Sequence, residues 1–160
     1  MSPTFAEAID RYVAGAPVLL SALEGLSPED LLARPIEDTW SIQEIIVHLW
    51  DSDMVAADRM KRVIAEETPL LVYMDENLAV TKLGYDQTDV RLAADLFRLN
   101  RIYMGNLLRR QSDDAFARFG IHTQAGKKTL LDLVTGYANH LDGHMVHLRR
   151  KRELLGKPLA

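Results

Sequence analysis

The fold is decided first by residues 41–66, which read SIQEIIVHLWDSDMVAADRMKRVIAE. Apolar residues recur there at three- and four-residue steps, which is the period of an amphipathic helix. Ser41 and Glu44 carry a start signal, because the serine can cap free N–H groups and the glutamate three residues later can close a capping box. Pro69 follows and cannot continue a helix. The stretch therefore predicts one long helix that ends near residue 66.

Three more amphipathic patterns lie on either side of this helix. They predict helices over residues 5–23, 88–110 and 130–155. Pro17 is expected to bend the first or to loosen one turn of it, and Thr129 to cap the last. The inward face of the helix over 88–110 is expected to hold Val90, Leu92, Ala93, Leu96, Phe97, Leu99 and Ile102. The connection over 69–85 carries a weaker pattern that predicts a short helix.

The remaining segments predict no convincing strand. Residues 119–128 look like an irregular loop, and 112–114 offer the cap of a short helical turn. Four long helices joined by short ones predict an all-α fold, a four-helix bundle with short connecting helices. A chain of 160 residues fits one domain, which we expect to span residues 1–160.

The composition excludes several classes of function. The chain has no cysteine, so it cannot form disulfides, thiolate zinc sites or cysteine nucleophiles. Its net charge of −4 argues against binding to a nucleic-acid backbone. No apolar stretch approaches the ~20 residues that cross a bilayer, and the first residues lack an export signal. We therefore expect a soluble, cytoplasmic protein that does not bind nucleic acid or membranes.

Histidines on two predicted helices suggest a metal site. His140 and His144 are one helical turn apart, so their imidazoles can reach one ion. His48 lies among apolar residues of the helix over 41–66 and is the candidate third ligand, because a buried imidazole needs a partner. His147 lies on the same stripe and could replace either helix partner or lie just behind the ligands. Histidines that simply pack in the core or lie on the surface remain an alternative.

The chain resembles the DinB/YfiT-like superfamily of metal-dependent proteins. The similar segments are residues 25–31 (GLSPEDL), 40–51 (WSIQEIIVHLWD), 126–133 (GKKTLLDL) and 140–147 (HLDGHMVH). Both halves of the family signature, W-S-x-x-E-x-x-x-H-x-x-D and a later H-x-x-x-H, occur in order. The resemblance implies a four-helix bundle, commonly a homodimer. It also implies that His48, His140 and His144 bind one divalent ion such as zinc or nickel, although relatives often carry glutamine where this chain has His147.

Four further residues are candidates for the site. Asp51 follows His48 by one turn and could orient a ligand, or it could be an ordinary solvated carboxylate. Arg101 could hold a carboxylate of a substrate by a bidentate contact, or it could form a surface salt bridge. Tyr73 and Tyr85, in the long connection, could cover the mouth of the site or pack in the core.

The resemblance also implies a reaction. Relatives include transferases that use mycothiol, bacillithiol or glutathione, and a thiol-dependent isomerase. The expected function is a transferase that activates a low-molecular-weight thiol on the metal ion and acts on a small molecule, and the absence of cysteine agrees with an external thiol. A metal-dependent hydrolase and a non-catalytic metal- or ligand-binding stress-response bundle stay open as alternatives.

Overall fold

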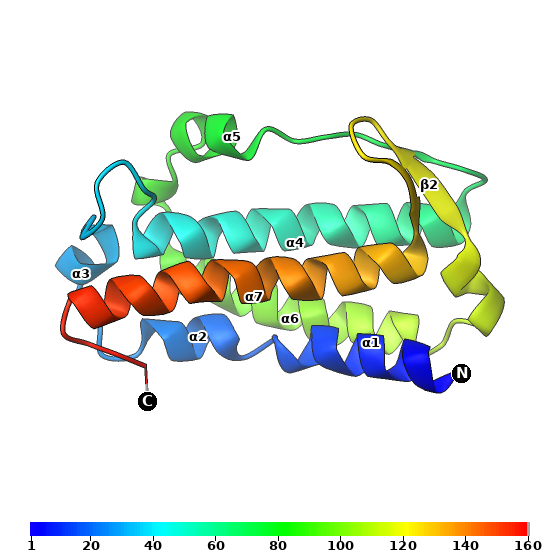
Figure 1. Ribbon diagram of the computed structural model, residues 1–160, viewed down its shortest axis with the longest axis horizontal. Coiled ribbons are helices and arrows are strands. Elements are labelled where there is room, and N and C mark those ends of the chain that lie inside the picture. The colour runs from blue at the N-terminus through cyan, green and yellow to red at the C-terminus, as the bar shows by residue number, and fades with distance from the viewer. Residues whose placement is uncertain (160) are drawn as a thin grey trace.

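The computed structural model describes residues 1–159 and is a four-helix bundle, as predicted (Figure 1). Its helices are α1 (Pro3–Ala14), α2 (Val18–Leu23), α3 (Pro28–Leu32), α4 (Ile42–Ala65), α5 (Glu76–Lys82), α6 (Val90–Leu108) and α7 (Leu130–Leu154), with 3₁₀ turns at Tyr85–Gln87 and Asp113–Ala117. The strands are β1 (Leu70–Leu71), β2 (Phe119–His122) and β3 (Gly126–Thr129). None of the helices in residues 1–159 combines the length and apolar composition that crossing a bilayer requires.

The order and direction of the helices explain why a long connection runs along the outside of the bundle. Both α4 and α1 contact α6 and α7, so the four helices form a ring. Figure 1 shows α4 and α6 running the same way, with α1, α2 and α7 running the opposite way. Two parallel helices need a connection that returns along the bundle, and residues 66–89 make this return. The returning chain carries α5 alongside α4.

Capping boxes start the two helices that hold the candidate ligands. At α4 the Ser41 hydroxyl accepts from the Glu44 N–H at 3.2 Å, and the Glu44 carboxylate accepts from the Ser41 N–H at 2.7 Å. At α7, Thr129 and Asp132 form the same pair of bonds at 3.0 and 2.9 Å. These start signals are therefore confirmed, and they fix the register in which both helices present their side chains.

One of two predictions about local structure was confirmed and the other was wrong. The turn expected to loosen at Pro17 does so, and it divides the helix expected over residues 5–23 into α1 and α2, because Pro17 lacks an N–H and the chain passes close to α6 and α7 at Gly15. A Cβ on Gly15 would lie 2.4 Å from Arg101 Nη1 and 2.5 Å from Leu141 Cδ2.

The loop expected over 119–128 is an antiparallel hairpin of β2 and β3. Its strand β2 also pairs in parallel with β1, with Leu70 opposite Ile121. A Cβ on Gly120 would lie 2.8 Å from the Pro69 carbonyl oxygen, so glycine allows this close approach. The sheet ties the end of the hairpin to the start of the returning connection.

A buried ion pair lies among the apolar side chains of the core. Arg101 and Asp53 are each 1% exposed. The Arg101 guanidinium lies 4.5 Å from the centre of the Tyr12 ring and 4.4 Å from that of Phe97. These two rings belong to the two largest hydrophobic clusters, so the pair lies where the clusters meet.

One face of α6 is apolar and exposed. Val90, Ala93 and Phe97 are buried as predicted. Four residues of the predicted inward face point outward instead, with exposed fractions of 56, 36, 52 and 39% for Leu92, Leu96, Leu99 and Ile102. The prediction was wrong for these four because an apolar stripe in sequence does not distinguish a core face from an exposed one.

Candidate metal centre

Three imidazoles from two helices converge in the middle of the bundle. His48 projects from α4, and His140 and His144 project from successive turns of α7. The Nε2 atom of His140 lies 3.2 Å from that of His48 and 3.1 Å from that of His144. The structure thus brings together the three histidines that the sequence analysis singled out.

A carboxylate that the sequence analysis missed completes the cluster. Glu76, in the first turn of α5, places Oε2 3.1 Å from His48 Nε2. One ligand atom from each of Glu76 and the three histidines lies within 4.8 Å of the others. The only local signal was an acidic residue in the first turn of a short helix, which is common without any site. Its place here depends on the path of the returning connection.

The geometry fits a divalent cation. Two nitrogens that each bind an ion at about 2.0–2.1 Å lie about 3.0–3.4 Å apart, depending on the angle at the ion. The two measured Nε2–Nε2 distances fall inside this range. A donor set of imidazole nitrogens with one carboxylate oxygen suits zinc, nickel and similar transition metals. The residues present could therefore hold the ion that the family resemblance implies.

Burial keeps these imidazoles neutral, which is the form that binds metal. Loss of solvation, with a smaller effect of the neighbouring imidazoles, lowers the pKa of His48 to about 3. Burial, and then the charges of His144 and Arg101, lower the pKa of His140 to about 4, and burial, followed by His147, lowers the pKa of His144. Burial, and then Asp75, raise the pKa of Glu76. The cluster thus carries little of the positive charge that would repel a cation.

Trp40 packs against the ligand rings. Its ring lies parallel to that of His144, with an interplanar angle of 2° and centroids 6.0 Å apart. Its centroid is 4.9 Å from that of His48. The indole therefore shields one side of both imidazoles from water and limits their rotation.

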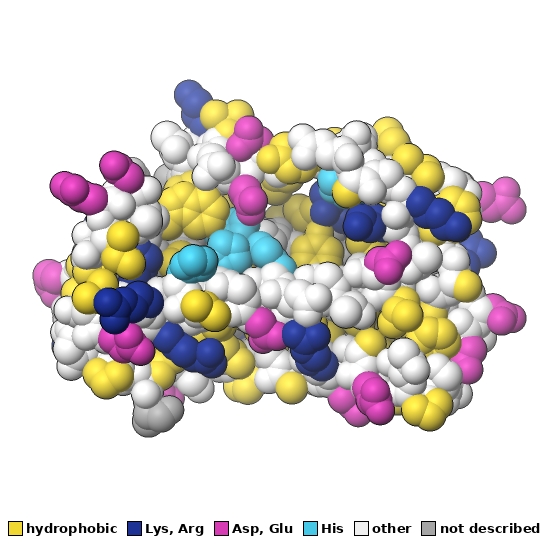
Figure 2. Space-filling model, viewed as in Figure 1, with side chains coloured by type: hydrophobic (Ala, Val, Ile, Leu, Met, Phe, Trp, Pro, Cys, Tyr) yellow, Lys and Arg dark blue, Asp and Glu magenta, His cyan; other side chains and the backbone are white. Residues whose placement is uncertain are grey.

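A cavity of about 560 Å³ opens beside His48 and His140. It lies between α4, α7 and the segments that carry Tyr73, Glu76 and His122. Figure 2 shows this hollow, with histidine side chains at its floor and Lys and Arg side chains across from them. A volume of this size accommodates a small molecule.

A match to a model of a protein family shows to which family this chain belongs. A model of the family described as the DinB superfamily matches residues 11–148. The chain belongs to the DinB superfamily. The match includes α4 and the part of α7 that carries His140 and His144.

Two relatives of this DinB-superfamily chain carry the same description, "putative metal-dependent hydrolase". The protein from Bacillus licheniformis is 27% identical over 143 residues, which are 88% of this chain and 81% of the relative. The protein from Oceanobacillus iheyensis is 28% identical over 109 residues, 68% of this chain and 63% of the relative.

Two solved structures share the fold. YfiT from Bacillus subtilis, described as "a probable metal-dependent hydrolase with an unusual four-helix bundle topology", superposes with a TM-score of 0.90 at 23% identity and covers 98% of this chain and 90% of its own. A mycothiol-dependent maleylpyruvate isomerase gives a TM-score of 0.71 at 15% identity, over 92% of this chain and 63% of its own. At these identities the likeness establishes the DinB fold.

The other predicted site residues lie outside the cluster of Glu76 and the three histidines. The Asp51 carboxylate accepts a 2.5 Å hydrogen bond from the Tyr85 hydroxyl. Burial, and then this bond, raise the pKa of Tyr85, so the phenol stays protonated. Tyr85 is 1% exposed and packs in a cluster with Val47, Ala79, Val80 and Ala93, so it does not cover the mouth of the site.

Arg101 is not a substrate contact. Its guanidinium is enclosed by Asp53 and the backbone carbonyl groups of Tyr12 and Tyr137. Of the remaining two, Tyr73 lines the cavity, whereas His147 is exposed and lines a smaller hollow with His144 and Trp40.

Proposed function

We propose that this chain is a metal-dependent enzyme that joins a low-molecular-weight thiol to a small-molecule electrophile. His48, His140 and His144 would hold one divalent ion, zinc or nickel, through their Nε2 atoms. The observation that carries the proposal is the convergence of three neutral imidazoles, with Nε2 atoms 3.1 and 3.2 Å apart, beside an open cavity. A structural site would be closed, whereas a catalytic site keeps a position open to a small molecule.

The ion, when bound, would supply Lewis acidity that lowers the pKa of a thiol or a water molecule reaching it. Glu76 is the group of this chain that would move the proton. Its side chain is 47% exposed, adjoins His48, and has a pKa raised by burial and by Asp75. It would take the proton of the S–H group as sulfur attacks the electrophile. It would return that proton to the leaving group, so that the enzyme ends unchanged.

Two features favour a thiol as the nucleophile. The cavity of about 560 Å³ offers room for a co-substrate as well as the electrophile, which water would not need. The chain has no cysteine of its own, so the sulfur would come from a small molecule. The fold shared with an isomerase named as mycothiol-dependent agrees with this choice.

Hydrolysis is the second candidate. The relatives from Bacillus licheniformis and Oceanobacillus iheyensis are both described as hydrolases, which supports it. The Glu76 carboxylate beside His48 could equally accept a proton from water. The two reactions share a site and differ in the nucleophile.

One experiment separates these functions. The purified full chain is analysed for bound metal by mass spectrometry, and then assayed with several thiols and a chromogenic electrophile. We expect one ion per chain and thiol-dependent turnover, both lost in His48→Ala and kept in the matched control His147→Ala. Turnover without thiol would support hydrolysis. Bound metal without any turnover would support a binding protein, and absence of metal would overturn the proposal.

We also propose that the protein forms a homodimer through α6. The support is the exposed apolar row on this helix, which includes Leu92, Leu96, Leu99 and Ile102. Such a row on a protein surface is typical of a face that another molecule covers.

A further inference from the structure

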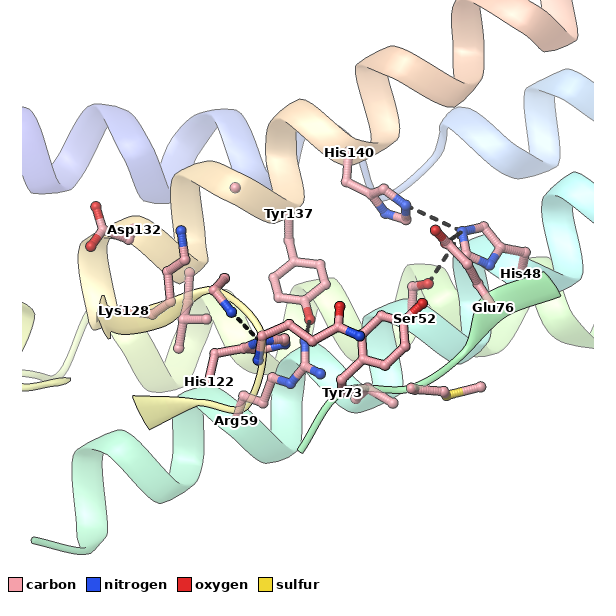
Figure 3. Close-up of a pocket in the computed structure, with 16 residues that line it drawn as sticks. His48, Ser52, Arg59, Tyr73, Glu76, His122, Lys128, Asp132, Tyr137 and His140 are labelled. Carbon is pink, nitrogen blue, oxygen red and sulfur yellow. Dashed lines mark hydrogen bonds and ion pairs between the residues drawn. The ribbon is translucent and has the colours of Figure 1, made fainter. Parts of the chain in front are cut away.

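A group of hydrogen-bond donors lies in the cavity beyond the candidate metal ligands. It consists of Arg59 from α4, His122 from β2, Lys128 from β3 and Tyr137 from α7, which we call the cationic pocket. Figure 3 shows Arg59, His122 and Tyr137 grouped away from His48, His140 and Glu76, with Lys128 on the far side. The proposed function does not use any of these four residues.

Arg59 and Lys128 bring positive charge without a matching carboxylate. Arg59 donates from Nη1 to the Tyr137 hydroxyl and from Nη2 to the Val72 carbonyl oxygen, both at 2.6 Å, and these acceptors are neutral. Its Nε is buried and has no partner within residues 1–159. In the same part of the chain, neither Arg59 nor Lys128 forms an ion pair. A half-buried guanidinium without a counter-ion is costly, so an anion bound here would be stabilised.

The two neutral groups are also positioned to donate. The Nδ1 atom of His122 accepts the backbone N–H groups of Gln124 and Ala125, each at 3.2 Å, which leaves the ring proton on Nε2. Arg59 and Lys128 line the same cavity as His122. Burial, and then the charges of these two cations, lower the pKa of His122. The Tyr137 hydroxyl oxygen accepts from Arg59, and its own proton remains available.

The nearest acid does not neutralise the pocket. Asp132 also lines the cavity, but its carboxylate accepts the Thr129 N–H as part of the α7 capping box. The other carboxylate of the cavity, Glu76, lies at its opposite side beside His48. Among the residues that line the cavity, Asp132 is therefore the one carboxylate on the side of Arg59 and Lys128, and the cationic pocket keeps a net positive charge. Arg62, one turn along α4 from Arg59, shows the contrast because it pairs with both Asp58 and Glu66.

We propose that the cationic pocket binds an oxyanion group, a carboxylate or a phosphate, of the enzyme's small-molecule substrate or co-substrate. His48 and His140 line the same cavity, so one molecule can hold its anionic end at Arg59 and Lys128 and its reactive end at the histidines. The link to the histidines rests on the proposed function, but anion binding itself does not. The substrate class is therefore an anionic small molecule, and neutral analogues are bound weakly.

The test measures anion binding directly. The full chain, both loaded with zinc and treated with a chelator, is titrated calorimetrically at constant ionic strength with succinate in one series and inorganic phosphate in another. Saturable binding is expected in both metal states. Arg59→Met and Lys128→Met should each weaken it at least about tenfold, since each removes a charge-assisted hydrogen bond. The matched control Arg62→Met should not change it.

Succinate and phosphate distinguish the two kinds of anion, because the probe that binds more tightly shows whether the cationic pocket prefers a carboxylate or a phosphate. Lys128→Met keeps the test valid if Arg59→Met fails to fold, because Lys128 forms no ion pair within residues 1–159. The inference is overturned if neither anion binds, if Arg62→Met weakens binding as much as Lys128→Met, or if binding disappears with the chelator. Loss of binding in the chelated protein would mean that the anion binds to the metal ion and not to the cationic pocket. Lack of turnover with anion binding intact would count against the proposed function alone.

Discussion

At the scale of single residues, the Asp53 carboxylate links three of the bundle's helices through its two oxygens. One of its oxygens accepts a hydrogen bond from Arg101 Nε at 3.1 Å and lies 3.0 Å from Arg101 Nη2 in an ion pair. The other accepts from Asn100 at 2.9 Å and from the Tyr12 hydroxyl at 3.1 Å. Tyr12 belongs to α1, and Asn100 and Arg101 belong to α6, so one carboxylate of α4 ties both of these helices to it.

Asp53→Asn should therefore destabilise the protein strongly. The amide keeps the shape but leaves the Arg101 guanidinium buried without its counter-charge, which costs about 3–5 kcal/mol. Urea unfolding at neutral pH measures the change. The control Asp58→Asn removes an exposed pair with Arg62 on the same helix and should cost less than about 1 kcal/mol. Similar losses of unfolding free energy in the two variants would show that the buried ion pair contributes no more to stability than the exposed one.

Glu76→Gln tests the role given to the carboxylate beside His48. We expect turnover to fall by about 10²–10⁴-fold, which is the usual contribution of a group that transfers a proton. The metal content should stay near that of the wild type, because three histidines remain. The measurement is the rate at saturating substrate together with the metal content of the same sample. A parallel loss of metal would make Glu76 a fourth ligand instead.

The residues of the site differ in how far sequence could predict them. Helical spacing predicts that His140 and His144 share one face of a helix, whereas their assignment with His48 to one ion depended on the family resemblance. Glu76 could not be predicted, because its position depends on how residues 66–89 return along the bundle. Arg101 lies on the buried stripe of α6 with Phe97 and Met104, but a second apolar stripe on the same helix is exposed, so the sequence could not show that Arg101 is buried. Once the buried stripe is known, a charged residue on it indicates a buried pair more readily than a substrate contact.

At the scale of elements, the capping box of α7 makes stability depend on pH. The Thr129 N–H, and then the Thr129 hydroxyl, lower the pKa of Asp132. Because the folded-state pKa lies below the unfolded value of about 3.9, this contribution is present above that value. It is lost as the pH falls through the lowered pKa.

Asp132→Asn should thus lower the free energy of unfolding at pH 7 by roughly 0.5–1 kcal/mol, as the loss of a helix-capping interaction does. The difference from the wild type should shrink steadily below about pH 4. Chemical unfolding at pH 7 and pH 3 measures both values. A difference that stays constant over this range would mean that the charge of Asp132 is irrelevant to the cap.

Long helices were predictable as elements and the sheet was not. Helices α4, α6 and α7 repeat their apolar period over 19–25 residues, which leaves little ambiguity. Strand β1 has two residues, and β3 reads Gly-Lys-Lys-Thr without apolar alternation. The sheet forms because α4 and α7 bring β1 and the hairpin to the same end of the bundle, and such long-range pairing leaves no local pattern.

At the scale of the whole molecule, the exposed row on α6 predicts the oligomeric state. If a second copy covers Leu99, which is 52% exposed, then Leu99→Glu should convert the dimer to a monomer, because a buried unpaired charge is costly. Light scattering of the purified protein measures the mass. The control Leu154→Glu alters a leucine of similar exposure, 47%, at the end of α7 and should leave the dimer intact. A wild type that is monomeric at high concentration would rule out the interface.

The candidate ligands come from three separate segments, so an ion should tie the molecule together. His48 lies on α4, His140 and His144 lie on α7, and Glu76 lies on the connection that returns between the parallel helices α4 and α6. An ion that binds only the folded chain stabilises it in proportion to the logarithm of its concentration, by about 4 kcal/mol at a thousand times the dissociation constant.

Zinc should therefore raise the Tm of the wild type and of His147→Ala, but leave that of His48→Ala unchanged. Chelation should return the wild type to its metal-free value. Hydrogen exchange adds a spatial test. The Glu76 carboxylate of α5 lies beside His48, where a bound cation would attract it, and α5 buries only Ala79 and Val80, whereas α4 and α7 bury many apolar side chains. Removal of the ion should accelerate exchange in residues 72–84 much more than in the buried turns of α4 and α7. Uniform acceleration along the chain would instead mean that the ion stabilises the bundle as one unit and that the returning connection is not held by it.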